Sequence, residues 1–299
     1  MERNRTALIG LGEAGLALGA GIDAAIGYDR LIGADATRAA LLARAEAAGV
    51  AVADGNAQAV AGAALILSLV TADQALAVAR ETAASIAPGA LFCDMNSVAP
   101  GTKRGAAAVI EAAGGRYVDV AVMAPVQPLR RRVPLLVAGP HAAAAVAALR
   151  QAGFADVRAV GGKVGAASAI KMIRSVLVKG IEALSAECAL AAEAAGVRAE
   201  VVASLDASWP GAGRGDGGWA RRFDYNLDRM MVHGRRRADE MDEVVKTLDA
   251  LGTGSTMARG TAARQRAIGA MALTPPDGLE AKLGALLSVL PSRLVEEAA

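Results

Sequence analysis

A glycine-rich hexapeptide near the start, Gly10-Leu11-Gly12-Glu13-Ala14-Gly15, constrains the fold of this chain more than any other segment. It follows an apolar run at residues 6–9 that predicts a strand, and a helical segment begins directly after it. A second apolar run, 24–28, predicts another strand and ends at Asp29. Strand, glycine turn, helix, strand and acid in this order form the dinucleotide-binding fingerprint in its required context.

Each glycine of the hexapeptide has a physical role in this interpretation. Gly10 permits a tight turn, Gly12 lets the backbone approach a pyrophosphate, and Gly15 lets the helix pack closely on the sheet. The amides and the positive dipole end at the start of the helix then hold the phosphates. The simpler alternative is a tight turn without a ligand, but the flanking pattern favours a nucleotide site formed by all six residues.

The residues at the end of the second strand bear on the choice of cofactor. Asp29 should accept hydrogen bonds from the adenosine ribose hydroxyls and repel a 2′-phosphate, so NAD is favoured. Arg30 keeps NADP open, because an arginine beside the acid can bind that phosphate; it is equally compatible with a solvated surface charge.

Composition narrows the classes of function. The chain has 299 residues, a hydrophobic fraction of 54%, few aromatic residues and a net charge of +2. This balance gives no argument for binding to nucleic acid or to an anionic membrane, and no stretch predicts a membrane span. Cys93 and Cys188 fit no disulfide or metal pattern, which favours a cytoplasmic protein. His141 and His233 are too isolated to predict a metal site.

The order of the predicted elements divides the chain into two domains. Apolar runs alternate with helical segments up to about residue 160, and this alternation predicts a mainly parallel sheet covered on both faces. After Gly162 the strand pattern disappears. We therefore expect an α/β Rossmann-type dinucleotide-binding domain over residues 1–162, followed by an all-α domain over 163–299.

A polar stripe runs along a long helix predicted over residues 165–196. Five polar side chains fall within about 80° of one another on this helix: Ser168, Lys171, Ser175, Lys179 and Glu182. Apolar residues cover most of the remaining surface, so the pattern predicts a helix buried on most sides with its stripe facing a cavity. Lysine is rare in this arginine-rich chain, and unlike arginine it can release a proton at accessible pH. The alternative is a solvated face with an ordinary Lys179–Glu182 pair.

Taken together, these features resemble the β-hydroxyacid dehydrogenase superfamily, which includes 3-hydroxyisobutyrate and 6-phosphogluconate dehydrogenases. The resemblance covers almost the whole chain and rests on these segments: residues 10–15 with Asp29-Arg30, Asp94-Met95-Asn96-Ser97 leading to Pro100, residues 118–122, residues 165–171 and residues 187–196. It implies that Lys171 is the catalytic lysine. It also places the family's substrate-binding serine at Asn96, with Ser97 next to it.

Several positions depart from the family pattern. Met123, Ala124 and Pro125 stand where the family usually has Ser-Gly-Gly to hold a substrate carboxylate. Arg174 and Ser175 replace two asparagines that usually follow the catalytic lysine. The chain is more similar to a divergent branch described as 6-phosphogluconate-dehydrogenase-like. The reaction class therefore transfers better than the substrate.

The resemblance implies an NAD(P)-dependent oxidoreductase acting on a small hydroxy acid or related polar alcohol, with Lys171 as general acid and base. We expect the nicotinamide ring near Leu69-Val70-Thr71 and Asn96, at the carboxyl ends of the strands. The expected substrate contacts are Asn96, Ser97, Met123, Ala124, Arg174, Ser175 and Lys179.

Two other functions and some features of assembly stay open. An imine reductase or amine dehydrogenase has the same two-domain design, and a non-catalytic dinucleotide-binding redox sensor would tolerate the altered substrate motif. We also expect a homodimer, because the helical domain cannot easily cover its apolar surface alone. The segment His233-Gly234-Arg235-Arg236-Arg237 is expected to be a solvated face with ion pairs to Asp239 and Glu240, or to reach a partner's active site. The glycine-rich loop flanked by Trp209 and Trp219 is a lid or a plain surface loop.

Overall fold

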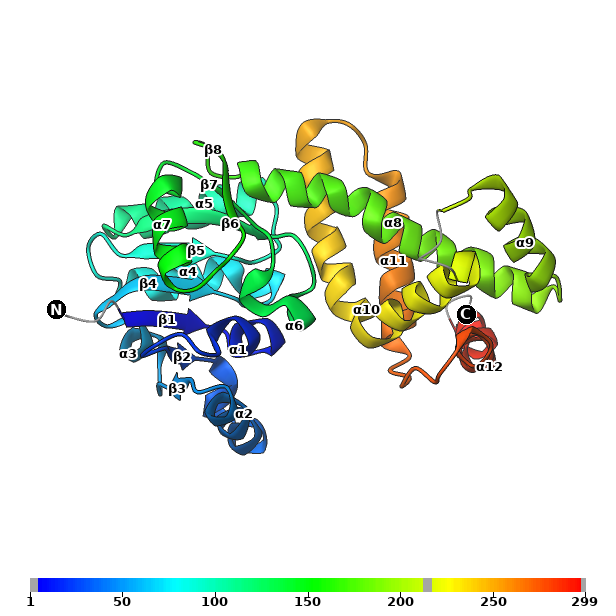
Figure 1. Cartoon of the computed structure of the whole chain (residues 1–299), viewed down its shortest axis with the longest axis horizontal. Coiled ribbons are helices and arrows are strands. Elements are labelled where there is room, and N and C mark those ends of the chain that lie inside the picture. The colour runs from blue at the N-terminus through cyan, green and yellow to red at the C-terminus, as the bar shows by residue number, and fades with distance from the viewer. Residues whose placement is uncertain (1–4, 212–216, 297–299) are drawn as a thin grey trace. The chain divides into compact units, whose positions relative to one another are not determined.

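The computed structural model describes residues 5–211 and 217–296, and their side chains as far as residue 289. It divides into two compact units, residues 1–173 and 174–299 (Figure 1). The domain border predicted at Gly162 falls at the end of the last strand, whereas the first turns of the long helix α8 (Ala166–Ala194) belong to the first unit. The predicted lid falls mostly on residues 212–216, outside the described residues.

The first unit contains the predicted sheet. Its strands are β1 (Arg5–Ile9), β2 (Ile26–Tyr28), β3 (Ala51–Val52), β4 (Ala63–Ser68), β5 (Leu91–Asp94), β6 (Arg116–Val122), β7 (Leu135–Ala138) and β8 (Val157–Gly161). They form an eight-stranded sheet in the order β3-β2-β1-β4-β5-β6-β7-β8. All neighbours pair in parallel except β6 and β7, which are antiparallel. The Rossmann-type fold predicted from the sequence is confirmed.

Helices cover both faces of this sheet, as the apolar strands predict. The helices are α1 (Glu13–Gly19), α2 (Asp35–Ala47), α3 (Asn56–Val60), α4 (Ala75–Ala83), α5 (Pro100–Ala112), α6 (Val126–Leu129) and α7 (Ala142–Gln151). One core contains buried residues of α1, α2 and α7, and a second contains residues of α3, α4 and α5. Because the strands are buried on both sides, Asp94 on β5, Asn96 in the loop after β5 and Asp119 on β6 are buried polar residues of this unit.

The second unit is helical, as predicted. It comprises the rest of α8 together with α9 (Arg198–Ser208), α10 (Gly218–Leu251), α11 (Thr256–Ala270) and α12 (Leu279–Glu296). Gly234 on α10 lies against Gly269 on α11, and a Cβ atom built on Gly234 would come within 2.8 Å of the Gly269 backbone. The two helix backbones therefore make direct contact, which only glycine permits.

The orientation of α8 differs from the prediction. Ser168, Ser175, Lys179 and Glu182 are buried, so most of the polar stripe faces inward. The apolar residues Ile173, Leu177 and Leu184 are exposed instead, and they share one face of the helix within about 40°. The expectation of a helix with a buried apolar surface was wrong at these positions. The physical reason is that Lys179 and Glu182 find charged partners on α10, as described below.

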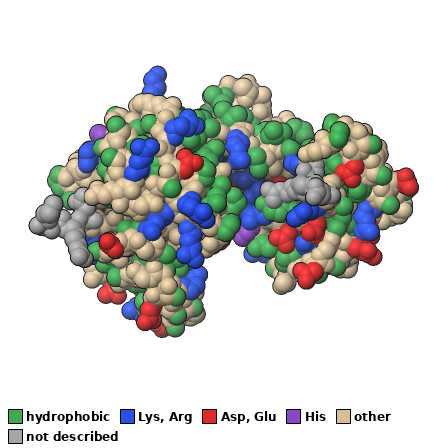
Figure 2. All heavy atoms as spheres, viewed as in Figure 1, with side chains coloured by type: hydrophobic (Ala, Val, Ile, Leu, Met, Phe, Trp, Pro, Cys, Tyr) green, Lys and Arg blue, Asp and Glu red, His purple; other side chains and the backbone are tan. Residues whose placement is uncertain are grey.

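The surface combines charged and hydrophobic side chains. The face in Figure 2 carries Lys and Arg as well as Asp and Glu side chains among hydrophobic ones. Within the described part of the chain, the helices are all too short or too polar to cross a membrane.

Candidate active site

The glycine turn after β1 has the backbone geometry that its sequence predicts. Gly10 has φ +98°, a conformation that favours glycine, and its amide donates to Tyr28 O at 2.8 Å. A side chain on Gly10 would collide with the Leu69 carbonyl, and one on Gly15 would collide with the Gly10 carbonyl. These two glycines are therefore required by the fold of the turn itself.

Gly12 differs from the other two glycines of the turn, Gly10 and Gly15. It has φ −70° and ψ −168°, which any residue can adopt, and a Cβ built on it has no protein atom within 4 Å. The protein's own packing therefore gives no reason for glycine here. Open space beside the first turn of α1 is what a pyrophosphate approaching the backbone requires, so the turn fits the cofactor. Glu13 is exposed and Ala14 partly buried at the start of this helix.

Asp29 is fixed at the end of β2 by the backbone. Its Oδ2 accepts from Leu11 N at 2.8 Å and its Oδ1 accepts from Leu31 N at 3.0 Å. The carboxylate thus lies beside the glycine turn, where the sequence predicts a contact with ribose. The Leu11 side chain is fully buried, so this residue contributes through its backbone, and Arg30 is exposed next to the acid.

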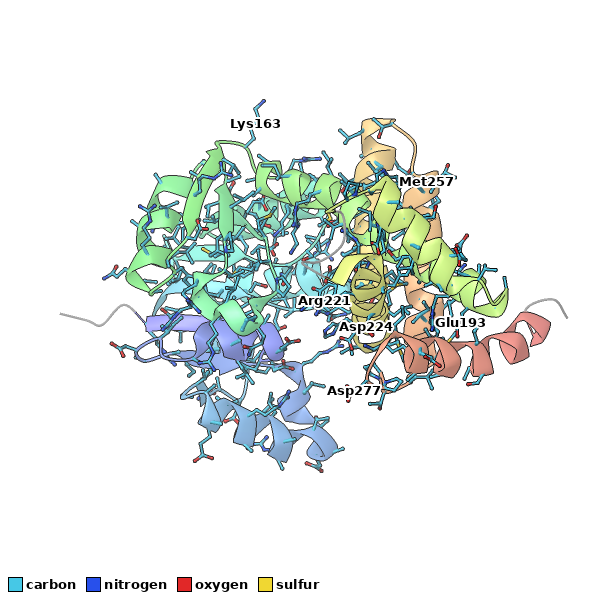
Figure 3. All side chains as sticks on the ribbon, turned by 45° about the vertical axis from the view of Figure 1, so that its right-hand side comes forward. Lys163, Glu193, Arg221, Asp224, Met257 and Asp277 are labelled. Carbon is cyan, nitrogen blue, oxygen red and sulfur yellow. The ribbon has the colours of Figure 1, made fainter. Side chains whose placement is uncertain are left out.

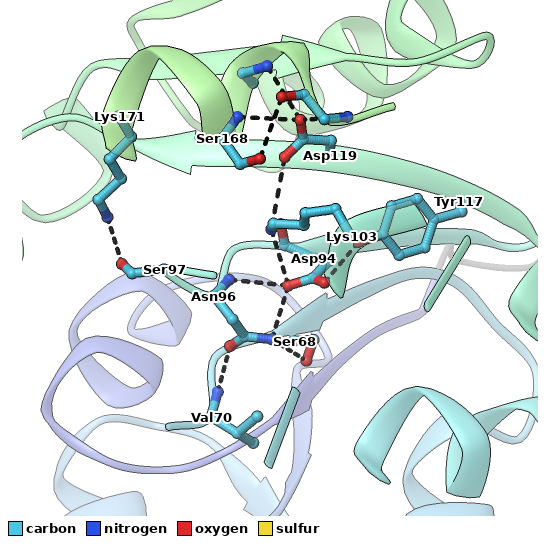
Figure 4. A network of polar contacts seen from close by, with 12 residues as sticks. Ser68, Val70, Asp94, Asn96, Ser97, Lys103, Tyr117, Asp119, Ser168 and Lys171 are labelled. Carbon is cyan, nitrogen blue, oxygen red and sulfur yellow. Dashed lines mark hydrogen bonds and ion pairs between the residues drawn. The ribbon is translucent and has the colours of Figure 1, made fainter. Parts of the chain in front are cut away.

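Asn96 links the ends of two neighbouring strands. Its Oδ1 accepts from Val70 N at 2.7 Å, and its Nδ2 donates to Ser68 Oγ at 3.0 Å and to Asp94 Oδ1 at 2.7 Å (Figure 4). The loops after β1, β4 and β5 meet at one edge of the sheet, where the strand order reverses between β1 and β4. This switch point is where open α/β sheets bind their ligands. Leu69 is partly buried and Thr71 exposed in the same loop.

Lys171 reaches these loops from the second turn of α8. Its Nζ donates to Ser97 Oγ at 2.6 Å, and Ser97 follows Asn96 directly (Figure 4). The first unit therefore brings together the predicted catalytic lysine, Asn96, Ser97 and the glycine turn at one edge.

A buried ionic network beneath this edge was missed by the sequence reasoning. Lys103 Nζ lies 3.0 Å from Asp94 Oδ1 and 3.6 Å from Asp119 Oδ1, and all three side chains are buried (Figure 4). Tyr117 donates from its hydroxyl to Asp94 Oδ2 at 2.6 Å. Burial and the neighbouring Asp94 carboxylate raise the pKa of Tyr117 well above its usual value, so the hydroxyl stays a donor. A charged residue between valines, Val118-Asp119-Val120, was the available signal.

Four other residues predicted to contact the substrate are divided between two segments, the loop after β6 and helix α8. Met123 and Ala124 are partly buried after β6, in the first unit. Arg174 is exposed and Ser175 buried on α8, one turn beyond Lys171. The prediction that they bind substrate stays a prediction.

Lys179 lies in a buried ion pair of the helical unit. Its Nζ is 2.6 Å from Glu240 Oε2, so the ammonium already has an anionic partner. Burial lowers the pKa of Lys179 below its usual value, and the Glu240 carboxylate partly opposes this effect.

A second buried ion pair joins the same stripe to α10. Glu182 pairs with Arg237 and accepts from Gln265 Nε2 at 3.0 Å. The expected ion pair to Glu240 is confirmed for Arg236, at 3.6 Å, whereas Arg237 is buried and is not part of a solvated face. These contacts replace the simple Lys179–Glu182 pair considered from the sequence.

Comparison with known proteins agrees with this geometry. Residues 5–149 match the NAD-binding domain of 6-phosphogluconate dehydrogenase, and residues 192–268 match a domain of unknown function (DUF1932). A conserved hypothetical protein from Sinorhizobium meliloti 1021 is 37% identical, with a TM-score of 0.70 over 95% of this chain and 96% of that one. The chain belongs to the β-hydroxyacid dehydrogenase superfamily.

Two further solved structures place the chain within this superfamily's fold. MTH1747, a conserved protein of unknown function with structural similarity to 3-hydroxyacid dehydrogenases, is 25% identical, with a TM-score of 0.64 over 89% of this chain and 99% of that one. Mycobacterium tuberculosis 3-hydroxyisobutyrate dehydrogenase, solved with L-serine, has a TM-score of 0.73 at 17% identity over 95% of this chain and 99% of that one, and shows the fold alone. No curated protein matches the sequence.

Proposed function

We propose that this β-hydroxyacid dehydrogenase relative transfers hydride between a nicotinamide cofactor and a small hydroxy acid or related polar alcohol. The observation that carries the proposal is the 2.6 Å hydrogen bond from Lys171 Nζ to Ser97 Oγ. It puts a titratable amine at the carboxyl edge of a dinucleotide-binding sheet, next to Asn96. A purely nucleotide-binding protein has no need for a proton carrier there.

The chain's own residues then handle the proton and the orientation of the substrate. NAD supplies the hydride acceptor when it is bound. Lys171 takes the proton of the substrate hydroxyl at Nζ in the oxidation direction and returns it to the carbonyl oxygen in the reverse direction. Asn96 and Ser97 hydrogen-bond the substrate from the loop after β5. Arg174 and Ser175, which follow on α8, contribute further polar contacts.

The cofactor preference follows from Asp29. A carboxylate held on both oxygens by backbone amides cannot turn away from a 2′-phosphate, so we propose NAD as the preferred cofactor. Exposed Arg30, next to the acid, is a group that would favour NADP. Calorimetric titration of both nucleotides decides between them, and tighter binding of NADP would reverse the assignment.

An imine reductase activity is the second candidate function, and one observation favours it. Met123, Ala124 and Pro125 occupy the segment after β6 where the superfamily usually binds a carboxylate, and none of the three side chains carries a strong hydrogen-bond donor or acceptor. A substrate without a carboxylate fits such a segment better. Screening cyclic imines beside hydroxy acids and β-hydroxy amino acids separates the two activities.

We also propose that the protein is a homodimer. Ile173, Leu177 and Leu184 form an exposed apolar row on α8, and Leu177 is 68% exposed. Burying such a row against a second copy removes apolar surface from water, which favours association.

The proposed role of Lys171 is tested with Lys171→Met. We expect turnover to fall by roughly 10²–10⁴-fold while the NAD Kd stays unchanged, because the general acid is lost and the glycine turn is intact. Lys163→Met is the matched control, since Lys163 is an exposed lysine of the same unit that points away from the ribbon (Figure 3). Equal turnover of the two variants would remove Lys171 from this role, and NAD binding without turnover on any substrate would favour a redox sensor.

A further inference from the structure

Two buried carboxylates lie side by side in the sheet of the first unit. Asp94 on β5 and Asp119 on β6 are partners in the parallel register, and both are almost completely buried. Like charges placed directly opposite each other destabilise a sheet, and burial makes each charge costly. Lys103 from α5 is fully buried between them and also donates to Asp94 O at 2.6 Å. Such an arrangement calls for an explanation beyond packing.

Asp119 holds the start of the helix that carries Lys171. Its Oδ2 accepts from the amides of Gly165, Ala167 and Ser168 at 3.0, 3.0 and 3.1 Å. A carboxylate at a helix N-terminus satisfies orphan donors and complements the helix dipole. Because Lys171 lies one turn further along α8, this cap fixes where the lysine begins its reach toward Ser97.

Asp94 holds the other side of the site. Its Oδ1 accepts from Asn96 N at 3.0 Å and from Asn96 Nδ2 at 2.7 Å, so the carboxamide keeps its oxygen on Val70 N. The Tyr117 hydroxyl supplies the donor to Oδ2. Lys103 joins this cluster to Asp119 Oδ1, which accepts no hydrogen bond from the described residues and faces the ammonium at 3.6 Å.

We infer that Asp119 is a positioning residue for Lys171. It caps α8 and is coupled through Lys103 to Asp94, which orients Asn96, so one buried network sets both sides of the reaction site (Figure 4). The inference rests on the proposed function, and it adds a role for residues that touch neither substrate nor cofactor.

A double-mutant cycle tests this inference. Asp119→Asn keeps the side-chain shape and removes the charge, so it should speed hydrogen exchange at the amides of Gly165, Ala167 and Ser168. We expect kcat to fall roughly 10²-fold, as for a misplaced catalytic group, with the NAD Kd unchanged. If Asp119 acts through Lys171, then Asp119→Asn causes no further loss in the Lys171→Met background. An equal loss in both backgrounds would overturn the inference.

A control variant and a second double-mutant cycle accompany this test. Thr82→Val removes a buried hydrogen bond to Asn56 in the same unit, away from the site, and should lower stability without changing kcat. Tyr117→Phe removes the donor to Asp94 and leaves the α8 cap; we expect kcat to fall about tenfold, with no further loss in an Asn96→Ala background. This cycle tests the Asp94 side of the network alone. If Asp119→Asn does not fold, Asp119→Glu, which keeps the charge but displaces the carboxylate from the α8 amides, goes through the Lys171→Met cycle in its place, and an equal loss in both backgrounds overturns the inference.

Failure of the inference and failure of the proposed function look different. If the wild-type protein turns over a substrate but the losses of kcat in the double-mutant cycles are additive, only the positioning role is overturned. No wild-type turnover on any substrate overturns both.

Discussion

Replacing Gly12 by alanine separates cofactor binding from folding. Gly12 has backbone angles that alanine adopts freely, and its Cβ would meet no protein atom. Alanine reduces the entropy of the unfolded chain, which stabilises by about 0.4–1 kcal/mol, but it is a poorer N-cap than glycine by a similar amount. The two effects oppose each other, so we expect the free energy of unfolding to change by less than about 1 kcal/mol.

The effect of Gly12→Ala on NAD should be much larger. A methyl group would occupy the open space where the pyrophosphate approaches the first amides of α1. Losing one hydrogen bond to a charged group costs about 1.5–3 kcal/mol, which corresponds to roughly 10- to 100-fold weaker binding. Thermal unfolding of the free protein and calorimetric titration with NAD measure the two quantities separately.

Gly55→Ala is the matched control for this substitution. Gly55 is also a helix N-cap with extended backbone angles, φ −159° and ψ 163°, and its Cβ would likewise meet nothing within 4 Å. It lies before α3 and outside the fingerprint. Both variants should unfold like the wild type, and only Gly12→Ala should lose affinity. Unchanged NAD affinity in Gly12→Ala would refute the assignment of the glycine turn as the phosphate site.

Three further predictions concern other parts of the chain. Burial raises the pKa of Cys93 to about 12, so at neutral pH an alkylating reagent should modify partly exposed Cys188 in the folded protein and Cys93 only after denaturation, as read by mass spectrometry. An unfolded thiol ionises near pH 9.0, so the contribution of Cys93 to stability is present below that pH and is lost as pH rises toward 12. Glu182→Gln leaves buried Arg237 without its carboxylate and should lower the free energy of unfolding by about 3 kcal/mol in chemical denaturation; no change would contradict a structural role for this pair. Leu177→Glu should convert the proposed dimer to monomer in light scattering without lowering stability, and an unchanged mass would argue against α8 as the interface.

Much of the fold was predictable because local patterns determine it. The hexapeptide with its flanking strands predicted the turn, and continuous apolar runs predicted strands buried on both faces. The reversed direction of β7 was not predicted, because an apolar run does not specify the direction in which its strand pairs.

The environment of α8 could not be predicted in the same way. Helical periodicity states which residues share a face, but it does not state which face is covered. Lys179 and Glu182 are buried because Glu240 and Arg237, far along the chain, supply opposite charges. Because the charged partners cover the side of α8 that carries Lys179 and Glu182, the opposite side of the helix, which carries Leu177, is left exposed.

The residues of the candidate site were predictable where the type of a residue, such as a lysine, indicates its chemical role. Lys171, Asn96 and Ser97 were found from their segments, and the structure brings them to one edge of the sheet. Lys103 was missed because a lysine beside Thr102 and Arg104 on a helix is typical of a solvated face. Its burial depends on Asp94 and Asp119 meeting in register, which only strand pairing reveals.

The central claim is that the Lys171 amine faces the reacting carbon at the edge where NAD binds. A crystal structure of the protein with NAD and a substrate found in the screen measures this directly. We predict that Lys171 Nζ lies within hydrogen-bond distance of the substrate oxygen on the carbon that faces nicotinamide C4. An amine directed into solvent, with another group bonded to that oxygen, would contradict the account.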